Sequence, residues 1–255
     1  MANPPTIVFI PGSFCPPFFY DDSIQKPIVS RGYEMHVLQY PSIGYKPNSL
    51  PTMADDAAFI SAEVAKVADE GKDIVLVAHS YGGIPASESV KGLSKADRKK
   101  AGKKGGVVRL AYMTALVPLV GGNAVGLLAD VPNEPEYIKD GWMYHVDFNT
   151  SAELIFSDLP LEQGIALAKS FLKHSSASFV GELTYPGYKD APVSYLFCEG
   201  DKCVPPAVQQ AMIDMVEKES CNKVDVTRIN ADHVPNQSAP ARVVDWIIKC
   251  VEKSK

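Results

Sequence analysis

A serine with small neighbours stands between an apolar run and a stretch with helical spacing. Residues 74–77 read Ile-Val-Leu-Val, and Ala78 and Gly82 flank Ser80 two positions away on either side. A strand that turns at once into a helix leaves no room for large side chains at these flanking positions, and it lifts the central side chain above the end of the strand. The pattern therefore predicts that Ser80 is a nucleophile on a tight turn.

A serine hydroxyl needs a base to take its proton, and that base needs an acceptor that holds it in the correct tautomer. His233 follows the last apolar run of the chain, and Asp201 follows an earlier one. In a parallel sheet the loops after the strands meet at one edge. We therefore predict a triad of Ser80, Asp201 and His233. Glu199 and Asp232 compete with Asp201 for the role of the acid.

The other four histidines fit the role of the base less well. His36 lies within an expected strand, His79 is the neighbour of the nucleophile, and His145 and His174 lie in a long aromatic insertion. We expect His79 to pack beneath the turn rather than to act on a substrate.

The elements that must position these residues alternate along the chain. Short apolar runs rich in β-branched residues predict strands over residues 6–10, 33–38, 74–78, 107–112, 193–198 and 223–229. Longer stretches with helical spacing lie between them, among them one that begins at Thr52 and ends near Gly71 and one capped by Ser238. This alternation is typical of an α/β fold, a mostly parallel sheet with helices on both faces.

The alternation is interrupted over residues 118–191, which are rich in Gly, Pro and aromatic residues. An insertion of this length between two strands is too long for a simple loop. We interpret residues 118–191 as a small, mostly helical cap, with one helix over residues 161–174. Residues 1–117 and 192–255 then form the core that carries the predicted triad.

The order of Ser80, Asp201 and His233 along the chain resembles that of the α/β-hydrolases, and the resemblance extends over nearly the whole sequence. It is closest to the compact branch that contains plant methyl esterases, hydroxynitrile lyases and their microbial esterase relatives. In that branch the first strand runs directly into the oxyanion loop, as residues 11–14 do here. The segment over residues 198–205 also looks like the acid loop of that branch.

The resemblance implies an oxyanion hole made by the backbone N–H of Tyr81 and by that of Ser13 or Phe14. Pro11 stands where many relatives have a histidine, so a side-chain hydrogen bond that braces the loop is missing. We expect the hole to survive, because the N–H groups that matter come after Gly12. Candidate pocket residues are Gly12, Phe14, Phe18, Trp142 and His145.

The predicted function is hydrolysis of a small, largely apolar carboxylic ester, lactone or thioester through an acyl-enzyme on Ser80. A lyase of the hydroxynitrile or retro-aldol type that uses the same triad is one alternative. Val234 follows His233 and no lysine is near in sequence, which argues against cyanohydrin cleavage. A small-molecule receptor built on the hydrolase fold is the other alternative.

Composition limits the partners that we expect. The chain has 255 residues and a formal net charge of −5, which argues against nucleic acid as the main partner. The basic stretch over residues 95–104 is interpreted as a solvated, mobile surface loop. A small-molecule ester substrate is the expected partner, the assembly is a monomer or a homodimer, and no dinucleotide, phosphate or metal motif predicts a cofactor.

Compartment is predicted from the first residues and from the cysteines. Residues 1–5 lack the basic start and apolar segment of a secretion signal, and no run is long enough to cross a bilayer, so a cytoplasmic location without membrane contact is expected. The five cysteines are odd in number and scattered, which favours reduced thiols. Cys15, beside the oxyanion loop, is expected to be a buried structural thiol.

Overall fold

The computed structural model describes residues 4–131 and 137–254, so residues 1–3 of the N-terminal segment and residues 132–136 of the expected cap lie outside the described residues. Six parallel strands form one sheet in the order β2-β1-β3-β4-β8-β9. Their bounds are β1 (Thr6–Ile10), β2 (Met35–Val37), β3 (Asp73–His79), β4 (Gly106–Met113), β8 (Val193–Cys198) and β9 (Asp225–Ile229).

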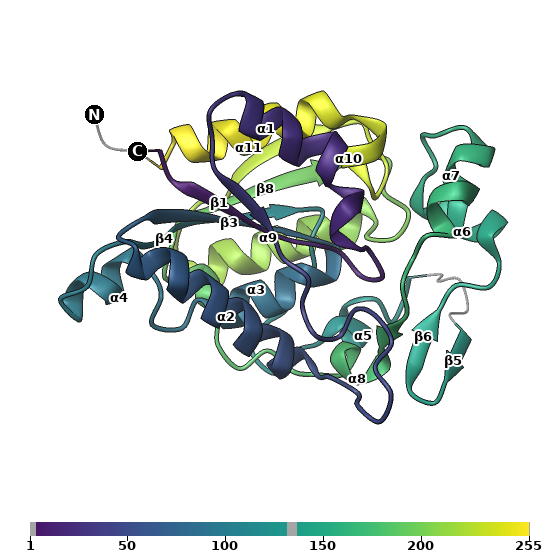
Figure 1. Cartoon of the computed structure of the whole chain (residues 1–255), viewed down its shortest axis with the longest axis horizontal. Coiled ribbons are helices and arrows are strands. Elements are labelled where there is room, and N and C mark those ends of the chain that lie inside the picture. The colour runs from purple at the N-terminus through teal and green to yellow at the C-terminus, as the bar shows by residue number, and fades with distance from the viewer. Residues whose placement is uncertain (1–3, 132–136, 255) are drawn as a thin grey trace.

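Helices cover both faces of this sheet (Figure 1). One face carries α1 (Lys26–Ser30) and α11 (Pro240–Glu252), and the other carries α2 (Met53–Asp69), α3 (Gly83–Ser89) and α9 (Pro206–Ser220). The predicted fold class, a parallel sheet between two helical layers, is confirmed. Within the described residues we find no helix with both the length and the apolar character needed to cross a membrane.

Strand β3 shows why such a sheet needs an unbroken apolar sequence. Ile74 and Leu76 pack into the core under α2, α3 and α9, whereas Val75 and Val77 pack into the core under α1 and α11. All four side chains are fully buried. A strand buried on both faces gains from an apolar residue at every position rather than at every second one.

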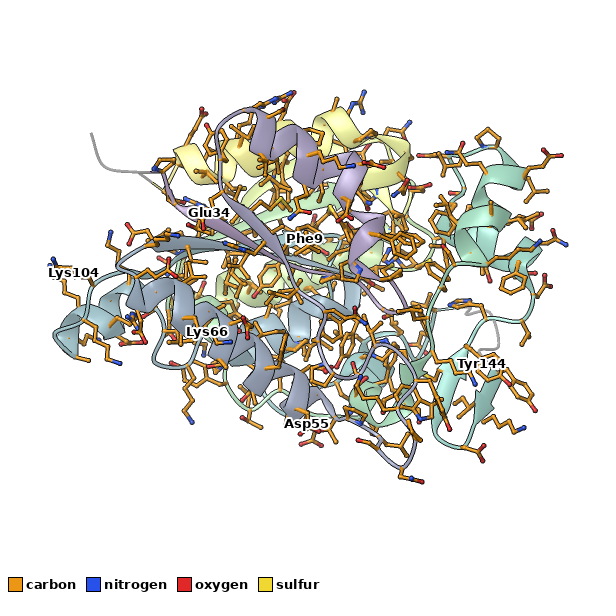
Figure 2. The ribbon with its side chains drawn as sticks, in the orientation of Figure 1. Phe9, Glu34, Asp55, Lys66, Lys104 and Tyr144 are labelled. Carbon is orange, nitrogen blue, oxygen red and sulfur yellow. The ribbon has the colours of Figure 1, made fainter. Side chains whose placement is uncertain are left out.

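Helix α2 begins where the sequence predicts. The Thr52 hydroxyl accepts a hydrogen bond from the Asp55 N–H, and the Asp55 carboxylate accepts one from the Thr52 N–H, which completes a capping box. Ile60 and Val64 are buried on the inner side of the helix. Asp55 and Lys66 lie at the periphery, whereas Phe9 lies in the interior (Figure 2).

The strand order places two loops side by side at the carboxyl edge. Strands β1 and β3 are neighbours, but the chain continues from β1 to one side of the sheet and from β3 to the other. The loops that follow such a pair diverge and leave a crevice, which is where open α/β sheets bind ligands. The residues after Ile10 and after His79 therefore face the same crevice.

The segment between β4 and β8 contains both helices and a small sheet. The helices are α5 (Ala124–Leu127), α6 (Phe148–Ile155), α7 (Leu161–Ala168) and α8 (Ser176–Phe179), and antiparallel strands β5 (Tyr137–Lys139), β6 (Trp142–Tyr144) and β7 (His174–Ser175) form the sheet. The helix expected over residues 161–174 ends at Ala168, because Leu172 turns to donate a backbone hydrogen bond to Phe14 and His174 pairs with Met143.

The basic stretch at residues 95–104 differs from the expected loop. Residues Lys95–Lys100 form α4, and the Ser94 hydroxyl caps this helix by accepting a hydrogen bond from the Asp97 N–H. Arg98 is buried, with Nη2 at 2.7 Å from an Asp69 carboxylate oxygen and at 3.0 Å from the Lys104 carbonyl. A helix held by a buried arginine replaces the solvated loop.

The remaining elements are short. They are α10 (Pro235–Ser238) and the single turns η1 (Pro17–Phe19), η2 (Asp21–Gln25), η3 (Ser80–Gly82) and η4 (Gly187–Lys189). Ser238 ends α10 instead of capping α11, and its hydroxyl donates to the Asp232 carboxylate. All five cysteines are free thiols, and burial raises the pKa of Cys15 to about 12.

Candidate active site

The turn after β3 has the close packing that its small residues predict. Ser80 has a φ of 52°, in the left-handed region that residues with side chains seldom adopt. A Cβ on Gly82 would lie 2.5 Å from the Pro11 carbonyl oxygen, and a Cβ on Gly12 would lie 2.8 Å from His79 Nδ1. Both glycines are therefore required for the β1 loop to pass directly beside the turn that carries Ser80.

The variant Gly82→Ala is expected to destabilise the protein by about 1–3 kcal/mol, because the added methyl group meets backbone that has no room to move. In thermal unfolding this loss corresponds to a fall in Tm of roughly 2–12 °C. Gly126→Ala is the matched control, since its Cβ would contact only Asn123 Oδ1 at 3.4 Å. Equal Tm values for the two variants would contradict the close-packing argument.

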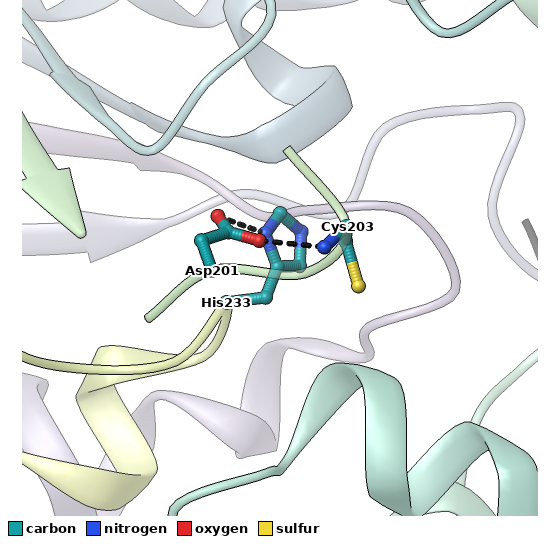
Figure 3. A group of neighbouring side chains, drawn as sticks. All are labelled: Asp201, Cys203 and His233. Atoms are coloured by element: carbon teal, nitrogen blue, oxygen red, sulfur yellow. Dashed lines mark hydrogen bonds and ion pairs between the residues drawn. The ribbon is translucent and has the colours of Figure 1, made fainter. Parts of the chain in front are cut away.

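Ser80, His233 and Asp201 form a continuous line of hydrogen bonds. Ser80 Oγ lies 2.9 Å from His233 Nε2, and His233 Nδ1 lies 2.7 Å from Asp201 Oδ2. Figure 3 shows the carboxylate facing the imidazole. The three residues are 8%, 7% and 3% exposed, respectively. Because a carboxylate oxygen only accepts, Nδ1 carries the ring proton and Nε2 is free to accept the proton of the serine.

The Asp201 carboxylate is held on all sides. The N–H groups of Cys203 and Val204 each donate to Oδ1 at 2.8 Å, and the Thr114 hydroxyl donates to Oδ2 together with His233. These donors orient the carboxylate toward the imidazole. Thr114 is absent from the sequence prediction, although its position directly after a strand places it at the correct edge of the sheet.

The two competing acids have other positions. Asp232 accepts hydrogen bonds from the N–H groups of Asp158 and Val234 and from the Ser238 hydroxyl, so it braces the loop around His233. Glu199 is exposed, and its backbone N–H pairs with β9. Asp201 is the carboxylate that bonds to His233.

The same loop raises the question of a metal site. Ligand atoms of Asp201, Cys203 and His233 lie within 4.8 Å of one another. However, Asp201 and His233 share a hydrogen bond, and the Cys203 thiol lies 3.7 Å from the Leu154 carbonyl in α6. Figure 3 shows the sulfur directed away from the carboxylate. A cation at this loop would have to displace the proton between Asp201 and His233, so the hydrogen bond between them opposes metal binding.

His79 connects the loop that carries His233 to the Tyr20 hydroxyl. Its Nε2 lies 2.8 Å from the His233 carbonyl oxygen, which only accepts, so Nε2 carries the proton and Nδ1 accepts from the Tyr20 hydroxyl at 2.8 Å. The Tyr20 oxygen in turn accepts the Gly12 N–H at 3.0 Å. Burial lowers the pKa of His79 to about 3, which keeps the ring neutral.

The loop after β1 has a brace in place of the histidine absent at position 11. The Tyr40 hydroxyl lies 3.1 Å from the Pro11 carbonyl and 3.3 Å from the Gly12 carbonyl. Phe14 has a φ of 62°, and its N–H is directed to His174 Nδ1 at 3.4 Å. Of the two candidate donors in this loop, Ser13 is therefore the one whose N–H bonds to no other described residue.

One cavity of about 520 Å³ opens over Ser80 and His233. Gly12, Phe14 and His145 line it, as do Cys15 and Lys202. The Lys202 ammonium lies 3.1 Å from the Glu153 carbonyl in α6. The acid loop therefore contacts the cap at the wall of the cavity.

Two of the candidate pocket residues lie elsewhere. Phe18 is 59% exposed on the η1 turn, where its ring packs beside Phe19. Trp142 is buried in the small antiparallel sheet, with its ring at 5.4 Å from that of Tyr45. Neither side chain is among the described residues that line the cavity.

Acid is expected to destabilise the protein through its buried neutral histidines. Burial lowers the pKa of His174 from 6.5 to about 3. Between these values the unfolded chain binds a proton that the folded protein does not, so the stabilisation is complete above pH 6.5 and is lost as the pH falls toward 3. For His174 alone the loss between pH 7 and pH 5 is about 2 kcal/mol.

Urea unfolding of the wild type and of His174→Asn at pH 7 and pH 5 measures this contribution. The other titrating groups are common to both proteins. Between pH 7 and pH 5 the free energy of unfolding of the variant is therefore expected to fall by about 2 kcal/mol less than that of the wild type. An identical loss in the two proteins would show that His174 does not stay neutral.

Comparison with known proteins agrees with this fold. Residues 7–246 match the model of the alpha/beta hydrolase family. The probable hydrolase R7 of a Phoma species is 34% identical over 245 residues, which cover 95% of this chain and 96% of the relative. A pyrethroid hydrolase from Sphingobium faniae superposes with a TM-score of 0.72 at 21% identity over 97% of both chains. Polyneuridine aldehyde esterase gives a TM-score of 0.74 at 17% identity, covering 97% of this chain and 99% of that chain.

Proposed function

Because the chain belongs to the alpha/beta hydrolase family, we propose that it is a serine hydrolase that cleaves a small, largely apolar carboxylic ester, lactone or thioester. The observation that carries the proposal is the line from Ser80 Oγ through His233 to Asp201, with separations of 2.9 and 2.7 Å. This line opens into an apolar cavity. The names of the structural neighbours, a pyrethroid hydrolase and an esterase, agree with this reaction class.

In the first step Ser80 Oγ attacks the carbonyl carbon of the ester, and its proton moves to His233 Nε2. Asp201 stabilises the imidazolium that forms, because the carboxylate already accepts the Nδ1 proton. Collapse of the tetrahedral adduct breaks the bond to the alcohol. The leaving alcohol takes the proton from Nε2, and an acyl group remains on Ser80.

Negative charge develops on the former carbonyl oxygen during this step. We assign its stabilisation to the N–H groups of Ser13 and Tyr81, which follow β1 and β3 at the crevice between these adjacent strands. A preorganised donor of this kind is worth roughly 3–4 kcal/mol in related chemistry.

Water completes the reaction by the reverse proton movements. His233 Nε2 takes a proton from water, the hydroxide oxygen bonds to the acyl carbon, and the bond to Ser80 Oγ breaks. The serine recovers its proton from His233 and the acid product leaves. Each step uses the same nitrogen, first as base and then as acid.

The walls of the cavity indicate the substrate class. Its lining is mainly aliphatic and aromatic, including Phe14, Leu128 and Phe171. At the opening, Val125, Ile138 and Val180 are each more than half exposed. Apolar side chains at both the wall and the entrance favour an aryl or alkyl group on the ester, in a volume of about 520 Å³ suited to a small molecule.

A small fluorophosphonate tests the proposal, because it bonds to a serine only where a base and an oxyanion hole act together. We expect a single adduct in the intact-protein mass spectrum of the wild type, located on the peptide that contains Ser80, and none on Ser80→Ala. Aryl esters of increasing acyl length then define the acyl preference. A wild-type protein that forms no adduct and cleaves none of these esters would overturn the proposed function.

A further inference from the structure

A buried carboxylate outside the triad lies beneath the oxyanion loop. Asp56, on α2, is fully buried, and no described residue forms a salt bridge with it. Its Oδ1 accepts the Ser42 N–H at 2.8 Å, and its Oδ2 accepts the hydroxyls of Ser42 at 2.6 Å and of Tyr81 at 2.9 Å. A buried charge is costly unless it is hydrogen-bonded, and these three donors offset that cost. The mechanism described above leaves this carboxylate without a role.

The carboxylate fixes the direction of every proton in a chain that leads to the oxyanion loop. Ser42 gives its hydroxyl proton to Asp56, so Ser42 Oγ accepts from His174 Nε2 at 2.7 Å. Ser178 Oγ lies 3.0 Å from the same nitrogen and gives its own proton to the Ser175 carbonyl. Both hydroxyls near Nε2 therefore accept, which places the only ring proton of the neutral imidazole on Nε2.

The other ring nitrogen then serves the loop. His174 Nδ1 has a free lone pair that accepts the Phe14 N–H at 3.4 Å, and the Phe14 carbonyl accepts the Leu172 N–H at 2.9 Å. Phe14 has a φ of 62°, a conformation that persists only where the surroundings hold it. These two bonds fix the peptide groups on both sides of Phe14, directly after Ser13.

The same carboxylate also reaches the second half of the oxyanion hole. Tyr81 follows the nucleophile, and its hydroxyl donates directly to Asp56. Its ring is stacked on Phe179 at 5.2 Å and lies edge-on to His174 at 4.9 Å. Asp56 is thus linked by hydrogen bonds to both backbone donor segments. It bonds directly to the side chain of Tyr81, and it is connected to the segment after Ser13 through Ser42 and His174.

We propose that Asp56 and His174 are positioning residues that hold the backbone donors of Ser13 and Tyr81 in the geometry that binds the oxyanion. This inference rests on the proposed function, and it places their effect on the transition state rather than on binding of the ester. It also explains why a charge is kept in the core, since only an acceptor without protons can impose this direction on the chain.

The variant Asp56→Asn reverses the chain with a minimal change in shape. The backbone N–H of Ser42 cannot turn, so the amide oxygen stays opposite it and the amide NH₂ faces the two hydroxyls. Ser42 must then accept from the amide and donate to His174 Nε2, which moves the ring proton to Nδ1. A proton on Nδ1 opposes the Phe14 N–H, so the oxyanion loop loses the acceptor that His174 provides.

We expect kcat for an aryl ester and the second-order rate of fluorophosphonate labelling to fall by about 10- to 100-fold in Asp56→Asn, with KM within about twofold. Side-chain ¹⁵N NMR at pH 8 is expected to show His174 protonated on Nε2 in the wild type and on Nδ1 in the variant. Burial raises the pKa of Asp56 only to about 6, so it is ionised at that pH. Tyr112→Phe is the control, since it removes a buried hydroxyl bonded to Ser87 Oγ at 2.7 Å, away from the oxyanion segments.

A merely structural role predicts a different result, namely a smaller labelled fraction that reacts at the wild-type rate and an unchanged His174 tautomer. That result would overturn the inference.

If Asp56→Asn does not fold, the variant Ser42→Ala tests the inference instead, because it removes the hydroxyl that links Asp56 to His174 and keeps the carboxylate. A kcat equal to that of the wild type in Ser42→Ala would then overturn it. A wild-type protein that does not react with the probe overturns the proposed function, whereas a reactive wild type with an equally reactive Asp56→Asn overturns this inference alone.

Discussion

Replacing Ser80 with alanine is expected to lower ester turnover by about 10⁴- to 10⁶-fold while the protein stays folded. The variant loses the only hydroxyl that bonds to His233 Nε2 among the described residues. Removal of Oγ does not relieve the backbone strain at this position, because alanine keeps the left-handed φ of 52°. The residual rate is expected to come from the oxyanion hole and from substrate binding, which stay in place.

Steady-state kinetics with an aryl ester measures this effect, and thermal unfolding of the same preparation shows whether the fold is intact. Ser80→Cys is a useful companion variant, since it keeps a nucleophile at the same position. Wild-type turnover in Ser80→Ala would require another nucleophile and would refute the acyl-enzyme on Ser80.

The strands and the meeting of Ser80, His233 and Asp201 at one edge of the sheet were predictable because their signals are local. Apolar runs such as Ile74–Val77 are required of any strand buried on both faces, and Ser80, Asp201 and His233 each follow such a run. Parallel strands bring their ends to one edge, so position along the chain predicts proximity in space. The sequence favoured Asp201 as the acid over Glu199 and Asp232, and the structure shows that the Asp201 carboxylate is the one that bonds to His233.

The network beneath the oxyanion loop could not be predicted in the same way. Ser42, Asp56 and His174 are separated by 14 to 132 positions and follow no strand in common. Nothing in the residue types around them differs from ordinary loop and helix sequence. Tertiary packing alone brings them together, so a sequence pattern carries no record of the contact.

The cap was the least predictable part for a related reason. Gly, Pro and aromatic residues indicate irregular structure, but they do not distinguish a helix from a short hairpin. The helix expected through His174 ends six residues earlier at Ala168, because His174 pairs with Met143 and bonds to Phe14. The argument against cyanohydrin cleavage used the absence of a lysine near His233 in the sequence. Proximity in sequence was misleading there, since Lys202 lines the same cavity although it is far from His233 in the chain.

Replacing Asp201 with asparagine is expected to lower kcat/KM by roughly 10⁴-fold, with little effect on Tm. The amide can enter the site in two orientations. In one orientation the amide NH₂ occupies the place of Oδ1. There it opposes the backbone N–H groups of Cys203 and Val204, which cannot turn. In the other orientation the NH₂ occupies the place of Oδ2 and opposes the Nδ1 proton of His233 and the Thr114 hydroxyl. The imidazole can change its tautomer and the hydroxyl can rotate, so both can avoid the clash.

The second orientation therefore prevails, and the imidazole responds by moving its proton from Nδ1 to Nε2. That nitrogen then faces Ser80 Oγ as a donor and cannot take the serine proton. Glu199→Gln is the matched control, since this exposed carboxylate lies in the same loop and is expected to leave kcat/KM unchanged. A large loss in Glu199→Gln, or a loss below tenfold in Asp201→Asn, would assign the acid to another residue. Fluorophosphonate labelling should slow in parallel with turnover, because attack of Ser80 on the probe needs the same unprotonated Nε2.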